Sequence, residues 1–560
     1  PGCEEVNSEL VEAILDEAGK FAAEIIAPLN APGDRQGCRL ENGAVKSPDG
    51  FREAYRKFVE NGWPALSCPA QFGGQGLPQV VAKPVQEMWK AANLSFSLCP
   101  MLTQGAVEAL LRHASPDQIN TFLPKLVSGE WSGTMNLTEP QAGSDLSAVR
   151  ARAEPQGDHY RIYGMKIFIT WGEQDFTGNI VHLVLARPPD APEGIKGISL
   201  FIVPKYLVNS DGSLGRRNDV QCVSLEHKLG IHASPTAVMS YGDKEGAIGY
   251  LVGQPNRGIE YMFTMMNQAR LAVGLEGVAI SDRAYQQAVN YARERVQGRS
   301  LTQPGAGRST IIHHPDVRRM LMSMKAQVEA MSSIAYVTAA YLDKAARHPD
   351  PQEQNRCQAL ADLLTPVVKG WCTENSIEIT STGIQIHGGM GFIEETGACQ
   401  HMRDARITTI YEGTTGIQAN DLMGRKMARE NGATLRALLE LMRADHAKVQ
   451  AVSDPDFAAI AVSQAASLDA LAECGEWVVK SYHQDASRAA AGAVPFLMLA
   501  GTVCGGWQMG CAAVAARQRL GANEGDESFN RTKIKTARFY ADHILPRVMG
   551  YRYAIVNGAD

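Results

Sequence analysis

The sequence predicts an α+β multidomain protein in which a β unit lies between helical blocks. The hydrophobic period is helical from Leu10 to about Arg112 and becomes typical of short strands between Trp131 and about Val252. A helical period returns after Gly258 and continues, with breaks, toward the end of the chain. Because helices and strands are segregated rather than alternating, a doubly wound parallel sheet is excluded.

The spacing of apolar residues supports each part of this order. One amphipathic stripe begins at Val11, another at Tyr285 and a third at Leu435. The middle unit contains strand-like runs at residues 160–170, 180–186 and 198–203. The chain is thereby predicted to form four domains: helical residues 1–130, β residues 131–252, helical residues 253–430 and a helical extension, residues 431–560.

Composition favours a soluble globular protein, with 45% hydrophobic and 20% charged residues. No apolar run approaches the roughly 20 residues of a membrane span, so none is expected. The first five residues lack the features of a leader, although a leader already removed would leave no trace. Eleven cysteines without a Cys-x-x-Cys pair predict reduced, mostly buried thiols and a cytoplasmic location.

Several chemistries have no support in the sequence. A net charge of -6 gives no indication of a nucleic-acid partner. No metal-ligand spacing, phosphate-binding loop, dinucleotide fingerprint or nucleophile elbow is present, and no metal is assigned. The informative segments are instead Asn136–Leu146, Lys166–Gly172, Gln385–Phe392 and Arg403–Gln418. Taken singly, each has the composition of an ordinary turn or helix end.

Taken together and in this order, the segments resemble the acyl-CoA dehydrogenase family over roughly residues 10–430. The matching motifs are Thr-Glu-Pro-x-Ala-Gly-Ser-Asp from Thr138, Lys-x-x-Ile-Thr from Lys166, Lys-Leu-Gly-Ile from Lys228, Asn-x-x-Arg from Asn267 and Tyr-Glu-Gly-Thr from Tyr411. The resemblance implies an N-terminal helical domain, a middle β-barrel or sandwich domain and a C-terminal four-helix bundle, with the extension as an extra helical domain. It also implies FAD as cofactor.

The resemblance assigns FAD contacts to five stretches of the chain. These are Asn136, Leu137, Thr138, Gly143 and Ser144; Phe168, Ile169 and Thr170; Arg295 and Gln297; Gln385, Gly388 and Gly389; and Thr414 with Thr415. Phe168 would stack on the flavin, and Thr170 would hydrogen-bond near N5, the atom that receives hydride. Arg295 and Gln297 would reach the FAD of a neighbouring subunit, which implies at least a dimer. Gly298-Arg299 replaces the family's usual Phe-Gly there, and an insert continues to Gly307.

Dehydrogenation between Cα and Cβ of a thioester requires a base and a hydride acceptor at the same bond. A carboxylate suits this base, because a water-poor pocket raises its pKa toward the operating pH. The resemblance makes Glu412 the base, and its backbone N–H a donor to the substrate carbonyl. Substrate contacts are assigned to Ser144, Asn267, Arg270, Tyr411 and Gly413.

Three readings within the superfamily remain open. The length resembles a bacterial branch that includes 3-methylthiopropanoyl-CoA dehydrogenases, alongside enzymes for short, medium and long chains, with electron-transfer flavoprotein as the expected acceptor. An acyl-CoA oxidase would share the base and FAD but use O₂. A DNA-associated alkylation-response flavoprotein would need a basic extension, whereas residues 431–560 carry 13 Lys+Arg and 13 Asp+Glu. The apolar stripes of that extension predict a homodimer, with the extension covering a surface that tetrameric relatives bury.

Overall fold

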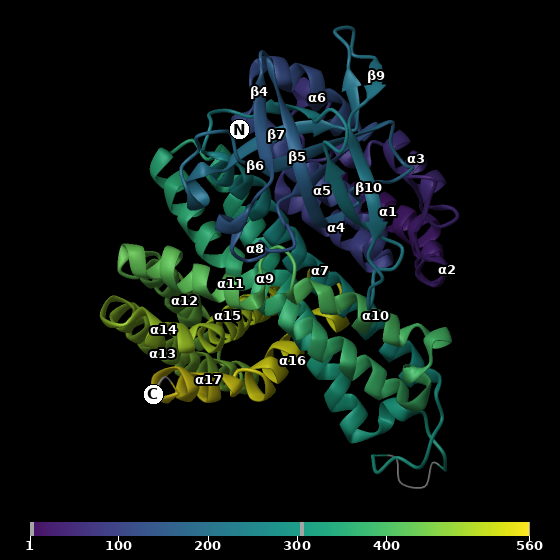
Figure 1. The fold of residues 1–560 in the computed structure, drawn as a ribbon. Coiled ribbons are helices and arrows are strands. Elements are labelled where there is room, and N and C mark those ends of the chain that lie inside the picture. Colours follow the sequence, from purple (N-terminus) through teal and green to yellow (C-terminus); the bar gives the residue numbers. More distant parts are fainter. Residues whose placement is uncertain (1–4, 303–306, 559–560) are drawn as a thin grey trace. The chain divides into compact units, whose positions relative to one another are not determined.

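The computed structural model describes residues 5–302 and 307–558 and divides into two compact units, residues 2–272 and 273–560. The division lies within one long helix, α7 (Gly258–Glu294). Figure 1 labels the elements along the chain. Residues 1–4, on which the leader prediction depends, and residues 303–306 of the insert lie outside the described residues.

The first unit opens with helices around an aromatic core. They are α1 (Ser8–Phe21), α2 (Asn30–Gln36), α3 (Phe51–Glu60), α4 (Gln79–Ala92), α5 (Leu94–His113) and α6 (Pro116–Ser128). The ring of Phe58 lies 4.8 Å from that of Trp89 and 5.9 Å from that of Phe96, between centroids. Such aromatic clusters remove large apolar areas from water and stabilise the unit.

A short hairpin, β1 (Arg39–Glu41) with β2 (Ala44–Lys46), interrupts these helices and corrects the prediction of continuous helical structure there. Its turn is Asn42-Gly43, with φ values of 52° and 76°. Asn-Gly is the strongest short-range hairpin signal, because both turn residues must adopt positive φ. The hydrophobic period did not reveal this hairpin, because each strand has only three residues.

The chain enters the β region through a well-capped helix. The side chain of Ser115 accepts from the backbone N–H of Gln118, and the side-chain oxygen of Gln118 accepts from the backbone N–H of Ser115. This reciprocal pair fixes the start of α6. Gly129 ends the helix at φ 83°. The first strand of the large sheet begins two residues later, at Trp131.

The rest of the first unit is β structure, as predicted. Its strands are β3 (Trp131–Asn136), β4 (Arg152–Gln156), β5 (His159–Thr170), β6 (Asn179–Ala186), β7 (Ser199–Pro204), β8 (Tyr206–Val208), β9 (Leu214–Arg217), β10 (Val220–Leu225), β11 (Thr236–Tyr241) and β12 (Ala247–Leu251). Eight form one sheet in the order β10-β11-β5-β12-β7-β6-β3, with β4 beside β5. Among the named strands of this described sheet, β3 and β6 are the pair that runs in parallel, and the other pairs are antiparallel. The strand β5 lies inside this sheet and carries most of the predicted Lys166–Gly172 segment, whereas the Asn136–Leu146 segment begins at the last residue of β3.

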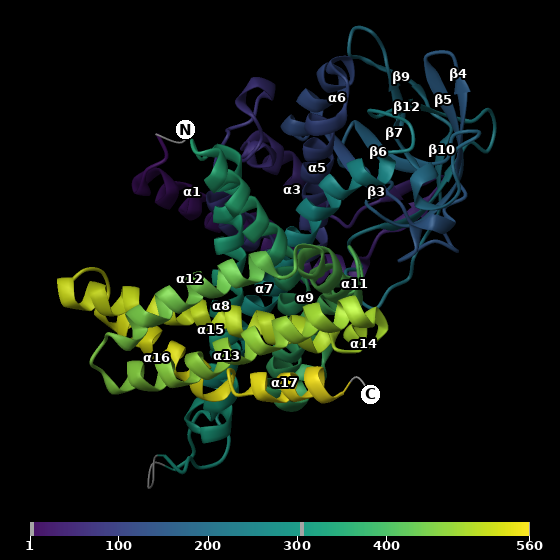
Figure 2. The ribbon, with the colours of Figure 1, turned by 90° about the vertical axis from the view of Figure 1, so that its left-hand side faces the viewer.

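The second unit is helical. After α7 it contains α8 (Pro315–Arg347), α9 (Pro351–His387), α10 (Ala398–Ala405), α11 (Thr415–Asn420), α12 (Ala433–Gln450), α13 (Pro455–Gln484), α14 (Ala486–Ala491), α15 (Ala493–Ala522), α16 (Glu527–His543) and α17 (Arg547–Asn557). Figure 2 shows α12, α13, α15 and α17 of the extension side by side. Two ion pairs, Lys533 with Glu329 and Arg547 with Glu378, join the extension to α8 and α9.

The expectation that no apolar run approaches the length of a membrane span was wrong for three helices. Within the described residues, α5, α13 and α15 are long and apolar enough by length and composition. In the folded chain 83%, 50% and 72% of their apolar stretches, respectively, are buried. Protein packing therefore accounts for most of the apolar character of α5 and α15.

Ten cysteines lie within the described residues, and none forms a disulfide. Seven of the ten are buried. Burial raises the pKa of Cys68, Cys474 and Cys504 to about 12, which keeps these groups as thiols at neutral pH. The burial of most of these cysteines agrees with the prediction of packed thiols.

Candidate active site

A buried ion pair fixes the Thr138–Asp145 segment to the central strand of the first unit. Nζ of Lys166 lies 2.8 Å from a carboxylate oxygen of Glu139 and also donates to the carbonyl of Leu137 at 3.0 Å. Both side chains are almost fully buried. The same carboxylate accepts hydrogen bonds from the backbone N–H groups of Arg150 and Ala151. Its oxygens therefore bind groups of the protein itself.

This anchoring decides which predicted residues of the segment are accessible. Gly143 and Ser144 are exposed, whereas Leu137 is buried and Thr138 is half-buried. The side chain of Asn136 is fully buried and hydrogen-bonds Tyr241 and Thr134, so only its backbone can serve a ligand. The carbonyl of Thr138 accepts from the N–H of Ile167, which brings the turn beside the predicted flavin strand.

Phe168 is the most unusual residue of that strand. Its aromatic side chain is 58% exposed, although large apolar side chains are normally covered. Its φ is 60°, in the left-handed region that non-glycine residues rarely adopt. The pairing of β5 with β11 shifts register here, with two residues of β5 opposite Val238. A β-bulge of this kind redirects a side chain, and here it turns an aromatic ring outward.

The next residues alternate between accessible and buried positions. Ile169 is buried, so its side chain belongs to the core, whereas Thr170 is half-exposed. Trp171 has φ 53° and donates from its indole N–H to the carbonyl of Ser95 at 3.2 Å. Thr170 is thus held between a bulge and an anchored tryptophan.

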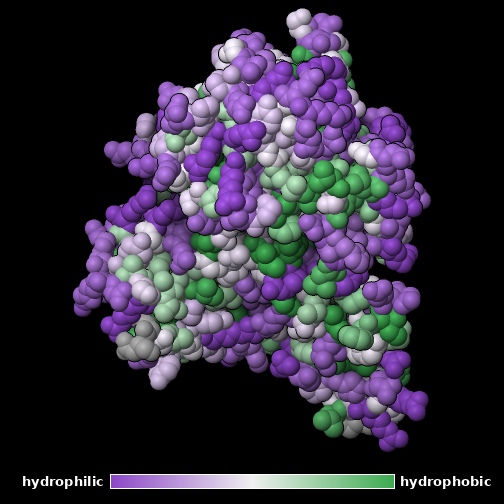
Figure 3. Space-filling view, in the orientation of Figure 1, coloured by the Kyte–Doolittle hydropathy of each residue, from purple (hydrophilic) through white to green (hydrophobic). Residues whose placement is uncertain are grey.

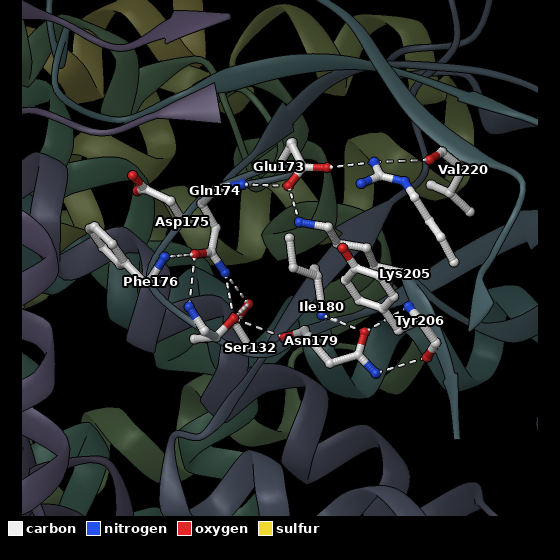
Figure 4. A network of polar contacts seen from close by, with 12 residues as sticks. Ser132, Glu173, Gln174, Asp175, Phe176, Asn179, Ile180, Lys205, Tyr206 and Val220 are labelled. Atoms are coloured by element: carbon white, nitrogen blue, oxygen red, sulfur yellow. Dashed lines mark hydrogen bonds and ion pairs between the residues drawn. The ribbon is translucent and has the colours of Figure 1, made fainter. Parts of the chain in front are cut away.

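Polar contacts secure the loop that follows Thr170 (Figure 4). The buried carboxylate of Glu173 pairs with Lys205 and Arg217. The amide of Gln174 donates to Ser132 and accepts from the backbone N–H of Thr177 at 3.1 Å. Movement of the loop would therefore break the buried ion pair of Glu173 with Lys205, and removing one partner of such a pair costs about 3–5 kcal/mol.

In the second unit, Glu412 lies in a short loop between α10 and α11. Its φ is 56° and that of the following Gly413 is 89°, so two consecutive residues have left-handed backbones. A non-glycine residue in this region costs on the order of 1–2 kcal/mol. Thr414 ends the loop by capping α11, with its side chain accepting from the N–H of Ile417. Strain of this kind persists only where surrounding contacts hold it.

Four side chains supply those contacts. Lys369 donates from Nζ to the carbonyl of Gly413 at 2.7 Å. The amide of Gln418 donates to the carbonyls of Glu412 and Gly413 at 3.1 and 3.2 Å. Hydroxyl groups complete the set: that of Tyr411 donates to Glu276 and that of Thr415 to Glu374. Burial, followed by the Glu276 carboxylate, raises the pKa of Tyr411 well above its ordinary value, so this tyrosine stays protonated.

The remaining predicted FAD residues lie at two adjacent helix ends. The ring of Tyr291 near the end of α7 stacks on that of His387 at the end of α9, 4.4 Å between centroids. Beyond these rings the predicted residues are exposed: Arg295, Gln297, Gln385, Gly388 and Gly389. Burial lowers the pKa of His387, so this histidine is a packed neutral group.

Exposed apolar side chains accompany these residues. Phe392 is 85% exposed, and Met390 and Ile393 are close to half exposed. Figure 3 shows apolar residues reaching the surface in the part of this unit around α10. Neighbouring apolar side chains that remain uncovered in one chain are typical of a surface that a protein partner covers.

Asn267 and Arg270 lie three residues apart on the first half of α7. Asn267 is exposed, whereas Arg270 is only 2% exposed, with its guanidinium 6.0 Å from the centroid of the Phe263 ring. Arg270 is therefore a buried residue and not part of a surface ion pair. A buried guanidinium is costly and is retained where its charge or its planar donors are needed.

The basic residues of the extension cluster locally at Arg531, Lys533, Lys535 and Arg538. Arg531 pairs with Glu527, Lys533 with Glu329, and Arg538 with Asp542 and Asp456. Three of the four cluster members thus have acidic neighbours, which lowers the local positive potential that DNA binding would use. Across the described chain, no group of His, Cys, Asp and Glu has the arrangement of a metal site.

Sequence reasoning missed the residues that hold the Glu412 loop. Glu276, Lys369 and Glu374 lie in none of the segments considered above, and Gln418, the last residue of the Arg403–Gln418 segment, had no predicted role. One signal was present, since Lys369 follows Val367 and Val368 and precedes Gly370-Trp371-Cys372, and an ionisable residue inside an apolar helical stretch indicates a buried role. Which carbonyl it would reach depended on the tertiary structure.

Family models cover most of the chain. The N-terminal, middle and C-terminal domains of acyl-CoA dehydrogenases match residues 8–130, 134–243 and 256–427, and an acetyl-CoA dehydrogenase C-terminal-like domain matches residues 436–560. The match at 436–560 covers nearly all of the predicted extension.

Among curated proteins, 3-methylmercaptopropionyl-CoA dehydrogenase of Ruegeria pomeroyi is 51% identical over 99% of this chain and 94% of its own length. A butyryl-CoA dehydrogenase of Syntrophomonas wolfei is 35% identical over 96% of this chain and 90% of its own length. The fold resembles that of an acyl-CoA dehydrogenase from Bacillus anthracis complexed with FAD, with a TM-score of 0.78, 20% identity, and coverage of 100% of this chain and 90% of that one.

Proposed function

This chain belongs to the acyl-CoA dehydrogenase family, whose members are FAD enzymes that dehydrogenate acyl-CoA thioesters, and from that premise we propose that Glu412 is the catalytic base. The observation that carries the proposal is the conformation of its loop. A carboxyl-bearing residue is held at φ 56° by hydrogen bonds to its own carbonyl and to its neighbours. Backbone strain maintained by surrounding contacts is typical of active-site residues.

We assign the cofactor contacts by the accessibility of the predicted residues. In the first unit the exposed ring of Phe168 would stack on the flavin, and the half-exposed Thr170 would hydrogen-bond its N5 edge. Gly143 and Ser144 would offer backbone N–H groups and a hydroxyl to its oxygens. Asn136, Leu137 and Ile169 would contribute through their backbones, because their side chains are buried.

The second unit supplies the remaining assignments. Thr414 would approach the cofactor as part of the Glu412 loop, and Thr415, whose side chain is buried, would do so through its backbone. Tyr411 and Gly413 would adjoin the substrate. The exposed Arg295, Gln297, Gln385, Gly388 and Gly389 would contact the FAD of a second subunit. The exposed Phe392 and its apolar neighbours support a homodimer in which a copy of the chain covers this surface.

The reaction follows from these roles. Glu412 removes a proton from Cα of the thioester and becomes a neutral carboxylic acid, while a hydride leaves Cβ and the Cα–Cβ double bond forms. FAD, when bound, supplies the acceptor of that hydride. The backbone N–H of Glu412 would stabilise the negative charge that develops on the thioester carbonyl. The buried guanidinium of Arg270 and the exposed amide of Asn267 would orient the CoA portion.

The substrate we favour is 3-methylmercaptopropionyl-CoA, which is the same compound as 3-methylthiopropanoyl-CoA. Support comes from 51% identity to the Ruegeria pomeroyi enzyme of that name over nearly the whole chain. Fatty acyl-CoAs such as butyryl-CoA are the competing substrates, since two relatives of 35% and 32% identity are named butyryl-CoA dehydrogenase. Electron-transfer flavoprotein is the proposed acceptor.

A bacterial cytoplasm is the location we favour, because the ten described cysteines are unpaired and the Ruegeria relative is bacterial. We infer neither a membrane span nor a nucleic-acid partner. Burial of most of the apolar stretch in α5 and in α15 supports the first inference. The ion pairs of Arg531, Lys533 and Arg538 with acidic residues support the second.

The test is anaerobic reduction of the flavin by a panel of acyl-CoAs, followed by absorbance. Wild-type protein should bleach fastest with 3-methylmercaptopropionyl-CoA. Glu412→Gln should retain the cofactor and reduce the rate by on the order of 10²- to 10⁴-fold, the usual contribution of a general base. Glu378→Gln, at an exposed acid of α9 paired with Arg547, is the control and should bleach at the wild-type rate.

The other outcomes discriminate between the alternatives. Bleaching of Glu412→Gln at the wild-type rate would eliminate this residue as the base. Faster bleaching by butyryl-CoA would reassign the substrate. Rapid reoxidation of the reduced flavin by air would indicate an oxidase, and tight, salt-sensitive binding of duplex DNA would restore the DNA-associated function.

A further inference from the structure

The helix α9 carries a buried ammonium group, that of Lys369, in contact with the Glu412 loop. Lys369 is fully buried, and its Nζ donates to the carbonyl of Gly413 at 2.7 Å. The neighbouring side chain from α11, Gln418, donates to that carbonyl and to the carbonyl of Glu412. The two peptide groups that follow Cα of Glu412 and of Gly413 are thus both fixed by side-chain donors.

Close packing of α7 on α9 keeps Lys369 in place. A Cβ atom added to Gly274 would lie 2.9 Å from the carbonyl oxygen of Val368, and one added to Gly277 would lie 2.8 Å from that of Cys372. Only glycine permits so close an approach of the two backbones. Because both contacts flank Lys369 in sequence, the lysine backbone has little freedom to shift.

The remaining anchors lie on either side of Glu412 in the sequence. Before it, the hydroxyl of Tyr411 donates to Glu276 on α7, which is fully buried. After it, the hydroxyl of Thr415 donates to Glu374 on α9. With these ends held, the conformation of the intervening residues depends on the bonds that Lys369 and Gln418 make to their carbonyls.

Packing alone does not explain why a lysine occupies position 369. Burial of an ammonium group carries a desolvation cost that an apolar side chain of the same length would avoid. Its charge-assisted bond to one carbonyl is strong, and that carbonyl belongs to a loop with two consecutive left-handed residues. Without the bond, relief of the strain at Glu412 would allow the loop to turn its carboxylate and its N–H away.

We propose that Lys369 is a positioning residue for Glu412, holding the Gly413 carbonyl so that the carboxylate and the backbone N–H of Glu412 keep one orientation toward the thioester. This inference rests on the proposed function, because it concerns the same base. Lys369 itself would take no proton from the substrate. Its contribution is to the rate of the chemical step rather than to the affinity for acyl-CoA.

The test compares Lys369→Met with wild type in steady-state turnover and in anaerobic flavin reduction. Methionine preserves length and apolar volume but removes the donor. The expected result is a fall in kcat on the order of 10- to 100-fold, since small misplacements of a reacting group have effects of this size, with KM for acyl-CoA within about threefold of wild type. FAD content should be unchanged. Lys533→Met is the matched control: it removes a partly buried lysine of the same unit that pairs with Glu329 on α8, and it should leave kcat unchanged.

A double variant shows whether Lys369 acts through Glu412. In the Glu412→Gln background, Lys369→Met should lower the rate little further, because the group it positions is already disabled. Full additivity of the two losses would overturn the proposal, as would wild-type kcat in Lys369→Met or a loss confined to KM. If Lys369→Met does not fold, Lys369→Gln serves instead, since glutamine is shorter and neutral, and wild-type kcat in that variant would also overturn the proposal. Failure of Glu412→Gln to slow reduction would instead overturn the proposed function itself, so the two failures are distinguishable.

Discussion

Glu412 and Gly413 show how residue chemistry and backbone geometry combine at the candidate site. Gly413 has φ 89°, a conformation that side chains rarely adopt, and a Cβ atom there would lie 2.7 Å from Nε2 of Gln418. That nitrogen is the donor to the Glu412 and Gly413 carbonyls. Glycine is therefore required by the loop itself and by the side chain that holds it.

Gly413→Ala should consequently impair both stability and turnover. The left-handed conformation costs alanine on the order of 1–2 kcal/mol, and displacement of Gln418 releases the Glu412 carbonyl. We expect an unfolding free energy lower by about 1–3 kcal/mol and kcat lower by at least about 10-fold, measured by urea unfolding and flavin reduction. Gly416→Ala is the control, because its Cβ would meet only Oγ1 of Thr414 at 3.8 Å. Equal effects of both substitutions would contradict this account.

At the scale of elements, the large sheet carries a buried polar chain across three strands. Tyr241 on β11 donates to Asn136 on β3, whose amide donates to Thr134, and Oγ1 of Thr134 lies 2.7 Å from Nδ1 of His182 on β6. The chain fixes the end of β3, from which the Thr138 segment departs. A fully satisfied network of this kind specifies one arrangement of the strands.

Because His182 belongs to this buried network, the stability of the protein should depend on pH. Burial, assisted by the charges of Lys205 and Arg217, lowers the pKa of His182 to about 3. The unfolded chain binds a proton at this residue below its ordinary pKa of about 6.5, whereas the folded chain does not until about pH 3, so stability is lost as the pH falls through that interval. Each such histidine contributes a slope of about 1.4 kcal/mol per pH unit.

His182→Gln should therefore lose less stability than wild type between about pH 6 and about pH 4, measured by urea unfolding. His401, whose pKa burial also lowers to about 3, retains its own contribution in the variant. Thr134→Val is the comparison, since it removes a partner of the imidazole but keeps the titrating group, and it should retain a steep slope. An unchanged slope in His182→Gln would show that this histidine is not the cause.

At the scale of the whole molecule, the extension is an integral part of the second unit. A Cβ atom added to Gly501 of α15 would lie 2.1 Å from Cγ of Trp371 on α9, and one added to Gly505 would lie 2.5 Å from the hydroxyl oxygen of Tyr540 on α16. The long central helix of the extension therefore packs backbone-to-side chain against the helix that carries Lys369. Trp371 is almost fully buried.

Gly501→Ala should accordingly destabilise this unit by about 1–3 kcal/mol or more, the usual cost of overpacking a core. Thermal unfolding followed by circular dichroism measures the effect. Gly521→Ala on the same helix is the matched control: it has no atom within 4 Å of the added Cβ and should be neutral or stabilising by up to about 1 kcal/mol. A Gly501→Ala protein as stable as wild type would show that α15 does not pack on Trp371 as described.

The sequence by itself determined the order of helical and β regions and the motifs that identify the family. Hydrophobic period is a local property, so residues a few positions apart suffice to reveal it. The motif Tyr411-Glu412-Gly413-Thr414 was found for the same reason. The Asn42-Gly43 hairpin was equally local and was missed only because its strands are too short to show a period.

Only the tertiary structure decided which predicted residues are accessible and what holds them. Asn136 and Ile169 turned out to be buried, Phe168 to be exposed at a bulge, and Arg270 to be buried. Lys369 and the Gly413 carbonyl are 44 residues apart in the chain, and they form a hydrogen bond because α9 packs against the loop. Such contacts depend on how helices and strands pack, and packing is a sum over many distant side chains that no short window of sequence contains.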